Sequence, residues 1–397
     1  MKKYIYILIS TVLLASCSID DFLDVKPTGV VIPTTVKDFD LLLNNPNTTH
    51  RSFDNIDYMD PDVLLNSALL ANLGQSLIER NEYEWNQNLF TIADTDSEWN
   101  NSYARIYVSN SILLTIDVAE LDGKSEKDRQ RIKGEALAQR AMDYFLLACQ
   151  YAPAYSAAKR NEAAIPMPLV PDINVKSSRE NLGFVFDQII ADLKAAESLL
   201  ANQSPVIQGS NFRPGKASVS GLLALVNLYI GEFDLAKTYA NKTLAAYNHL
   251  YDYTALQNVT PGDAWSGVNQ PEFQFSINDK SIIWSRLNKR SISYPFNGQL
   301  YSDDLLSIFD KNNDQRYLLF SSNKALDNTD RPVIDVAPHT AYASRNKNTQ
   351  AGLTVGHILL IKAEASIRST TPDKAGAISA LNTLLVKRIN GYTSLTN

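Results

Sequence analysis

Cysteine, histidine and clustered basic residues are all scarce in this chain of 397 residues. Cysteine occurs twice, at Cys17 and Cys149, so modification of the first would leave the second without a disulfide partner. The four histidines are isolated from one another, and neither H-E-x-x-H nor a zinc-type Cys/His spacing is present. The 37 basic residues are outnumbered by 43 acidic ones and form no block longer than a pair. Nucleic-acid binders concentrate lysine and arginine on one face or tail, so this composition argues against that class.

Motifs of catalytic and metal-binding sites are also missing. Gly209–Ala217 (GSNFRPGKA) resembles a P-loop, but its second glycine comes one residue late and Ala217 replaces the magnesium-binding hydroxyl. Asp310–Asp314 begins like a calcium loop, but Gln315 stands where glycine is needed. We therefore predict no enzyme activity, no metal and no cofactor. The sequence leaves open that two of its many acids converge in space as a glycosidase pair.

The apolar run near the start is too short to cross a bilayer. Tyr4–Ser16 has thirteen residues, whereas a spanning helix needs roughly 20. Because Lys2 and Lys3 precede the run and small residues end it, the pattern is typical of a secretory signal. Leu14-Ala15-Ser16-Cys17 resembles the bacterial lipobox, in which the cysteine is acylated and becomes the first residue of the mature chain.

These features divide the chain into three expected parts. We expect residues 1–16 to be a lipoprotein signal peptide, residues 17–30 a tether lipidated at Cys17, and residues 31–397 a single domain. Several acyl chains hold a protein stably to a membrane, whereas one chain holds it only marginally. An ordinary cleaved signal followed by a chance cysteine is the alternative.

Helical periodicity dominates the rest of the chain and predicts antiparallel helix pairs. Apolar residues recur with the 3.6-residue period, and Ser125–Asp128 has the pattern of a capping box. Because one pair cannot bury its own apolar face, such pairs stack into a solenoid. The predicted fold class is therefore mainly all-α, with tetratricopeptide-like pairs, a few short strands and long irregular insertions. The expected helices are residues 98–121, 125–151, 177–200, 217–230, 233–250, 354–368 and 373–389, and the insertions lie near 46–82 and 256–350.

Several stretches together resemble the SusD/RagB family of outer-membrane nutrient-binding lipoproteins. No single motif is diagnostic, but their number and order are. The stretches include Leu23–Gly29 (LDVKPTG), Trp99-x3-Tyr103-x2-Ile106-x3-Asn110, Ile132–Ala141 (IKGEALAQRA), Ala164–Pro168 (AIPMP), Arg213–Ala217 (RPGKA) and Leu360–Ala365 (LIKAEA).

The resemblance implies a location and a set of partners. Family members act as a lid on a SusC-like TonB-dependent transporter and capture oligosaccharides at the cell surface. The membrane contact would be a lipid anchor at Cys17 on the outer membrane. Ser18–Asp21 (SIDD) is similar to the acidic sequence that follows the cysteine in surface-exported lipoproteins, so we expect the domain to face the exterior.

Aromatic and short polar residues of the irregular regions are the expected ligand contacts. A sugar ring has an apolar C–H face that lies on an aromatic ring, while its hydroxyls need polar partners. Trp99, Glu135 and Arg140 are instead assigned to structure, the last two as buried and paired. The candidate contacts are Tyr58, Trp85, Trp265, Trp284, Tyr294 and Phe296, with Asp263, Asn269 and Asn297 as polar partners.

Three other functions stay open from the sequence alone. The same architecture could bind peptides instead of glycans. A lipid-anchored glycosidase would use an unrecognised carboxylate pair. A structural tetratricopeptide adaptor would present a smooth groove, and the two long aromatic insertions count against it.

Overall fold

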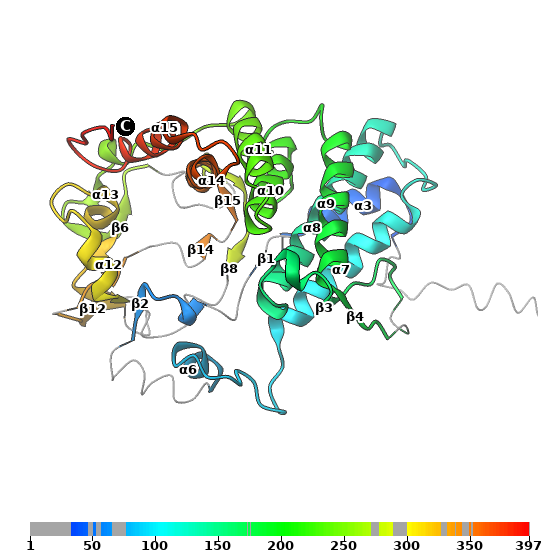
Figure 1. The fold of residues 1–397 in the computed structure, drawn as a ribbon, viewed down its shortest axis with the longest axis horizontal. Helices are drawn as coiled ribbons and strands as arrows, with labels where there is room; N and C mark the ends of the chain where they lie inside the picture. The colour runs from blue at the N-terminus through cyan, green and yellow to red at the C-terminus, as the bar shows by residue number, and fades with distance from the viewer. Residues whose placement is uncertain are drawn as a thin grey trace, which may run out of the picture. The chain divides into compact units, whose positions relative to one another are not determined.

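Antiparallel helix pairs form the scaffold of the described chain, as the apolar periodicity predicts (Figure 1). The computed structural model describes residues 33–46, 51–52, 57–65, 77–172, 174, 176–270, 278–288, 300–326, 332–337, 339–343, 349–350 and 352–396. The chain divides between Thr34 and Thr35, and the unit that begins at Thr35 contains all the elements below. The predicted signal peptide and the whole predicted tether, including Cys17, lie outside the described residues.

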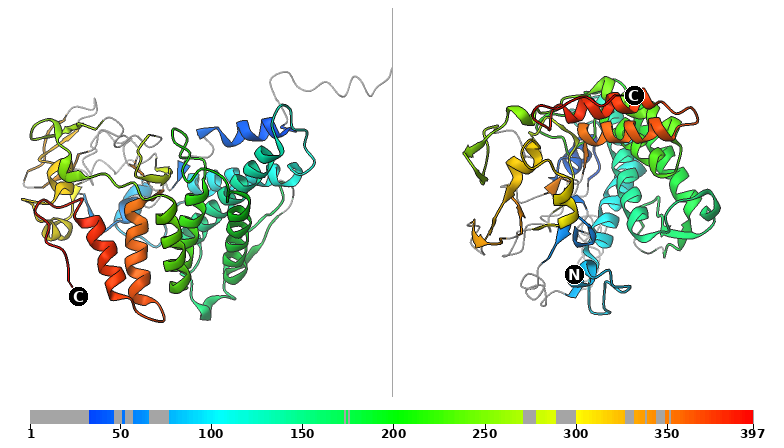
Figure 2. Two further views of the ribbon diagram at one scale, coloured as in Figure 1. Left: turned by 90° about the horizontal axis from the view of Figure 1, so that it is seen from above. Right: turned by 60° about the vertical axis from the view of Figure 1, so that its left-hand side comes forward.

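The helices agree closely with the predicted set. Helix α8 packs against α7 and α9, α10 packs against α11, and α11 packs against α14, which pairs with α15 (Figure 2). The described helices are α3 (Val36–Leu43), α6 (Leu77–Tyr83), α7 (Ser97–Thr115), α8 (Glu126–Tyr151), α9 (Leu182–Leu199), α10 (Lys216–Tyr229), α11 (Phe233–Ala246), α12 (Asp303–Ile308), α13 (Gln315–Phe320), α14 (Val355–Arg368) and α15 (Lys374–Leu385).

Local capping sets where these helices begin, and it corrects one prediction. The capping box at the start of α8 is confirmed, because the Ser125 hydroxyl accepts from the Asp128 amide and the Asp128 carboxylate accepts from the Ser125 amide. Helix α9 does not start after Ser177 or Ser178 as expected. Its N-cap is Asn181, whose side chain accepts from the Phe184 amide at 2.8 Å. The preceding residues are instead extended and pair with another strand.

Helix α8 runs through the centre of the largest core cluster. Most of its residues from Ile132 to Ala148 are buried, and Tyr144 and Leu147 are fully enclosed. Phe186 of α9 and Leu222 of α10 join the same cluster. Burying each such side chain stabilises the fold by about 1.5–3 kcal/mol, so the stacked pairs depend on one another for stability.

The proline-rich segment after α8 is held by its carbonyl groups. Its prolines lack amide donors and cannot extend a helix. The hydroxyl of Tyr103 donates to the Pro166 carbonyl at 2.6 Å, and Asn110 and Tyr144 both donate to the carbonyl of Pro168. The segment therefore lies across α7 and α8, and residues of the Trp99–Asn110 motif position it.

Short strands lie in both insertions. The few short strands predicted for the fold include β7 in the second insertion, whose partner is β15. Two short helices, α12 and α13, also lie where the sequence predicts only irregular chain. The described strands are β1 (Arg51–Ser52), β2 (Val63–Leu64), β3 (Ala163–Pro166), β4 (Arg179–Asn181), β5 (Asn258–Thr260), β6 (Asp263–Val268), β7 (Ile282–Trp284), β8 (Leu287–Asn288), β9 (Leu300–Tyr301), β10 (Ser321–Ser322), β11 (Lys324–Leu326), β12 (Pro332–Asp335), β13 (Ala341–Tyr342), β14 (Thr349–Gln350) and β15 (Leu353–Thr354).

These strands form several small sheets. The largest has the order β10-β13-β9-β2 and joins the first insertion to the second. A second sheet, β1-β8-β14, does the same, with β1 parallel to β8. Strands β3 and β4, β5 and β6, β7 and β15, and β11 and β12 form antiparallel pairs.

Buried ion pairs join the helices, as predicted for Glu135 and Arg140. The Arg140 guanidinium makes a bidentate ion pair with Asp192 of α9, with Nε–Oδ2 and Nη2–Oδ1 distances of 2.7 and 2.8 Å. Its Nη1 also donates to Asn110 Oδ1 of α7 at 2.9 Å. Glu135 is 1% exposed at its side chain and pairs with Arg131 and Arg213. Both residues are therefore structural, and each links α8 to another part of the scaffold.

Candidate functional site

Among the predicted aromatic contacts that the structure describes, Trp85 is the one that lies exposed on the surface. It comes two residues after the end of α6, just past residues 46–82, and is 65% exposed. Its backbone φ is +53°, in the left-handed region that a bulky residue adopts rarely. An exposed indole held in a strained backbone conformation is the first indication of a binding surface.

The end of α6 explains this conformation. The Trp85 amide donates to the Glu82 carbonyl at 3.1 Å, and the Asn86 amide donates to the Asn81 carbonyl at 2.9 Å. This pair of bonds is the Schellman motif, in which a left-handed residue, most often glycine, ends the helix. A side chain at that position costs about 1–2 kcal/mol. The helix therefore ends on a residue that disfavours the required conformation.

Polar side chains that precede and follow Trp85 in the sequence hold one another in place. The side-chain amide of Asn86 donates through Nδ2 to Asn81 Oδ1 at 3.0 Å and to Glu84 Oε2 at 3.1 Å. Arg80 Nε donates to Glu84 Oε1 at 2.9 Å, and this hydrogen bond lowers the pKa of Glu84. The result is an aromatic face beside carboxylate, amide and guanidinium groups whose geometry is set before any ligand arrives. We call Trp85 and these four residues the Trp85 platform.

Sequence reasoning identified Trp85 but missed its polar neighbours. A usable signal was present, because Asn81–Asn88 (NEYEWNQN) surrounds the tryptophan with amides and acids. The sequence alone does not show where α6 ends, and it is this helix end that brings Asn81 and Asn86 together.

Three other predicted aromatic contacts are buried, which corrects the prediction for them. Trp284 is 0% exposed, and its indole N–H donates to the Phe212 carbonyl at 3.0 Å. Trp265 is 6% exposed, and its indole N–H donates to the Lys324 carbonyl at 2.7 Å. Tyr58 is also buried and packs with Leu65. A buried indole whose N–H is satisfied packs well in a core, so these rings have no free face for a sugar.

The predicted polar partners in the second insertion hold a hairpin together. Asp263 Oδ1 accepts from the Trp265 amide at 3.0 Å. Asn269 exchanges two bonds with Gln257, one through its amide at 2.9 Å and one through its side-chain oxygen at 3.1 Å. Both residues therefore stabilise the β5–β6 hairpin. The remaining candidates, Tyr294, Phe296 and Asn297, lie outside the described residues.

Two features are absent from the part of the chain that the structure describes. No group of three or more His, Cys, Asp or Glu side chains is placed there to hold a metal ion. In the same part of the chain, no helix combines the length and the apolar character needed to cross a bilayer.

Comparison with known families and structures agrees with the resemblance drawn from the motifs. Residues 21–228 match a SusD-like family described as starch-binding and associating with the outer membrane. Because this match covers more than half of the sequence, the chain belongs to the SusD-like family. No match was found among curated proteins.

Solved structures show the same fold at low sequence identity. A putative sugar-binding protein from Bacteroides vulgatus aligns with a TM-score of 0.68 and 21% identity, over 92% of this chain and 80% of that one. A SusD superfamily protein from Bacteroides thetaiotaomicron gives 0.65 and 19%, over 90% and 81%. A laminarin-binding SusD-like protein gives 0.60 and 14%, over 90% and 84%. The predicted fold class and family are confirmed.

Proposed function

We propose that this protein is a lipid-anchored, non-catalytic glycan-binding subunit of a nutrient importer. In this proposal it captures oligosaccharides outside the cell and passes them to a SusC-like TonB-dependent transporter in the outer membrane. Three observations support it: the family match, the fold shared with a laminarin-binding protein, and the lipobox-like sequence that ends at Cys17. The division into residues 1–16, 17–30 and 31–397 is part of the same proposal.

The exposure of Trp85 is the observation that carries the binding role. A sugar ring can place its C–H face on the indole while its hydroxyls reach Glu84, Asn81 and Asn86. The affinity expected of such a surface is micromolar to millimolar, about −8 to −4 kcal/mol. Weak capture is sufficient when the ligand is released next to a transporter held at high effective concentration.

Replacing Trp85 tests this role directly. Covering about 100 Å² of apolar surface stabilises a complex by roughly 2.5 kcal/mol, so Trp85→Ala should weaken glycan binding about 10- to 100-fold. Trp85→Phe should retain part of the affinity. Tyr107→Ala is the matched control, because Tyr107 is an exposed aromatic residue (45%) on α7, outside the platform.

The assay is calorimetric titration with a panel of oligosaccharides, including laminarin and starch fragments, and a parallel panel of peptides. Binding of a glycan that Trp85→Ala weakens and Tyr107→Ala does not would support the proposal. Binding of peptides but of no glycan would show that the protein binds peptides instead. Release of reducing sugar from a polysaccharide by the purified protein would contradict a non-catalytic role.

A further inference from the structure

The loop between α9 and α10 folds back closely enough to form one wall of a pocket. The Lys216 and Ala217 amides donate to the Ser204 and Pro205 carbonyls at 3.2 and 3.0 Å. Gly215 permits this approach, because a Cβ there would lie 2.4 Å from the Pro205 carbonyl oxygen. On the opposite wall, α8 and the end of α9 make a similarly close contact at Gly134. The pocket between them has a volume of about 270 Å³.

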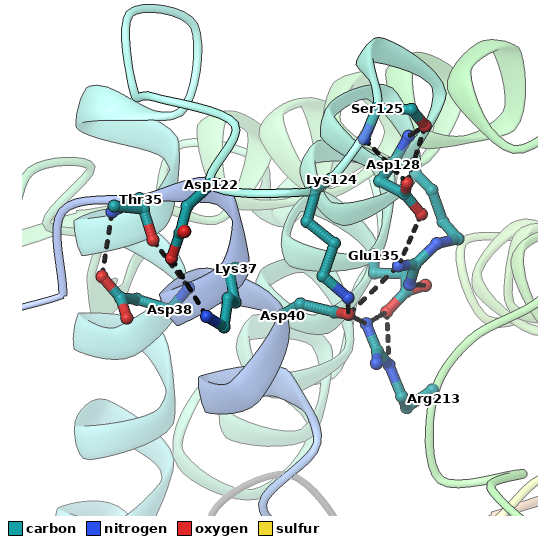
Figure 3. Close-up of polar contacts among 11 residues, drawn as sticks. Thr35, Lys37, Asp38, Asp40, Asp122, Lys124, Ser125, Asp128, Glu135 and Arg213 are labelled. Carbon is teal, nitrogen blue, oxygen red and sulfur yellow. Dashed lines mark hydrogen bonds and ion pairs between the residues drawn. The ribbon is translucent and has the colours of Figure 1, made fainter.

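Charged residues from α3, the turn before α8, α8 itself and the α9–α10 loop form one cluster (Figure 3), and three of them line the pocket: Arg131, Glu135 and Arg213. Glu135 receives Arg131 Nη1 at 2.8 Å on one oxygen and Arg213 Nε at 2.7 Å on the other. The same two arginines contact Asp40 Oδ1 from α3, at 3.1 and 2.7 Å. Lys124 donates to the second oxygen of Asp40 at 2.6 Å. Each arginine is thus already engaged with two carboxylates.

The positive and negative charges of this cluster balance, and the cations keep Asp40 ionised. Burial alone would raise the pKa of Asp40, but the hydrogen bond from Lys124 and the charges of Arg213 and Arg131 outweigh it, and the pKa lies well below its usual range. Asp128 adds a third carboxylate through Arg131, at 3.3 Å. Three cations therefore face three anions, and the base of the pocket is polar but carries no net charge.

Other residues that line the pocket offer hydrogen-bonding side chains that the protein does not use. The side chains of Asn44, Gln203, Ser204 and Ser210 line the pocket, and within the described residues none makes a hydrogen bond to the protein. Apolar groups lie beside them, contributed by Leu200, Ile207 and Pro214. Amides and hydroxyls next to a small apolar wall match the two kinds of surface that a sugar presents.

We propose that this pocket binds one neutral sugar residue at a site separate from the Trp85 platform. An anion is disfavoured because the arginine forks are already occupied by carboxylates, and a further buried negative charge would have to displace one of them. Sugar hydroxyls can accept from the amides and donate to the serine oxygens without disturbing the ion pairs. The volume is below the roughly 300–1,000 Å³ of pockets that hold larger ligands, which favours a single residue over a chain.

The test uses methyl glycosides of glucose, galactose, mannose and xylose as probes, with glucuronate and inorganic phosphate as charged comparisons. Binding is measured by saturation-transfer NMR and by calorimetry on the full protein. Asn44→Ala and Gln203→Ala each remove one polar group from the wall, and Ser210→Phe fills the space. Gln208→Ala is the matched control, since Gln208 belongs to the same loop but bonds to the Tyr247 hydroxyl outside the pocket.

We expect one neutral glycoside to bind, to lose about 3- to 10-fold in affinity with either alanine variant, and to lose binding with Ser210→Phe. Gln208→Ala should have no effect. Saturable binding that survives Ser210→Phe in a protein with an unchanged melting temperature would overturn the proposal, and so would binding of glucuronate or phosphate alone. If Ser210→Phe does not fold, the two alanine variants decide, and unchanged affinity in both refutes the site.

Trp85→Ala separates this inference from the proposed function. Methyl glycoside binding should survive unchanged in that variant, while oligosaccharide binding to the platform is weakened about 10- to 100-fold. Oligosaccharide binding by the unaltered protein with no glycoside bound by Trp85→Ala would refute the pocket and leave the proposed function intact. If both proteins bind the glycoside and neither binds an oligosaccharide, the pocket is supported and the proposed function is refuted.

Discussion

Replacing Asp192 by asparagine would leave the Arg140 guanidinium buried without a counter-charge. The two side chains are 9% and 4% exposed and meet in a two-pronged contact that joins α8 to α9. Gln188 supports the pair by donating to Asp192 Oδ1 at 2.8 Å. Removing one partner of such a pair costs about 3–5 kcal/mol, because the remaining charge stays desolvated. That is a large fraction of the roughly 5–15 kcal/mol by which domains are stable.

The assay is guanidinium unfolding followed by far-UV circular dichroism. Asp192→Asn and Arg140→Met should each lower the midpoint, with the denaturant slope unchanged. The combined variant Arg140→Met with Asp192→Asn removes both charges and should lie within about 2 kcal/mol of the unaltered protein, a coupling of at least about 4 kcal/mol.

A surface pair provides the control. Arg368 and Glu364 of α14 are 54% and 47% exposed at their side chains, so Glu364→Gln should change stability by no more than about 0.5 kcal/mol. If Asp192→Asn costs as little as this control, or if the two single effects simply add in the combined variant, then the pair does not hold the helices together as argued.

Four further predictions concern burial, backbone conformation and charge. Trp284→Ala should lower the free energy of unfolding by about 3–5 kcal/mol, because it empties a fully buried site. Trp85→Gly should raise the free energy of unfolding by about 1 kcal/mol, because glycine adopts the left-handed conformation without strain. Both are measured by thermal or chemical unfolding. Burial raises the pKa of the Cys149 thiol to about 12, so in a Cys17→Ala protein this thiol should react with a thiol reagent at pH 8 only after denaturation. Because the folded-state pKa of Asp40 lies below the unfolded value of about 3.9, its stabilisation is present at neutral pH and is lost as the pH falls through the folded-state pKa. Asp40→Asn should therefore be less stable at pH 7 and lose less stability on acidification, measured by unfolding between pH 7 and 2.

The helical scaffold could be predicted because its signals are local. Apolar periodicity and the capping box of α8 are short-range features, and both appear in the structure. The start of α9 was missed because a tertiary contact decided it. Residues Arg179–Asn181 pair with β3, and this pairing keeps them extended although two serines nearby could have capped a helix. Helices α12 and α13 have six residues each, too few for periodicity to reveal.

The candidate sites could be predicted only in part, because burial depends on distant partners. Trp284 and Trp265 are satisfied by carbonyls 72 and 59 residues away in sequence, and nothing near either residue shows that these acceptors are in reach. The pocket was missed for a similar reason. Glu135 and Arg213 occur in separate motifs, and only the folded chain places them around Asp40.

The conformation of Trp85 bears on whether its exposure is incidental. A helix end that requires a left-handed residue is best served by glycine, and tryptophan there costs about 1–2 kcal/mol of backbone energy. An apolar side chain can offset such a cost by burial, but this indole remains 65% exposed. Burial within the domain therefore supplies little compensation, whereas a ligand that covers the ring would supply roughly 2.5 kcal/mol. Trp85→Gly separates the two possibilities: a variant that is more stable but no longer binds glycan shows that the strain serves binding, and a less stable variant shows that the ring serves the fold.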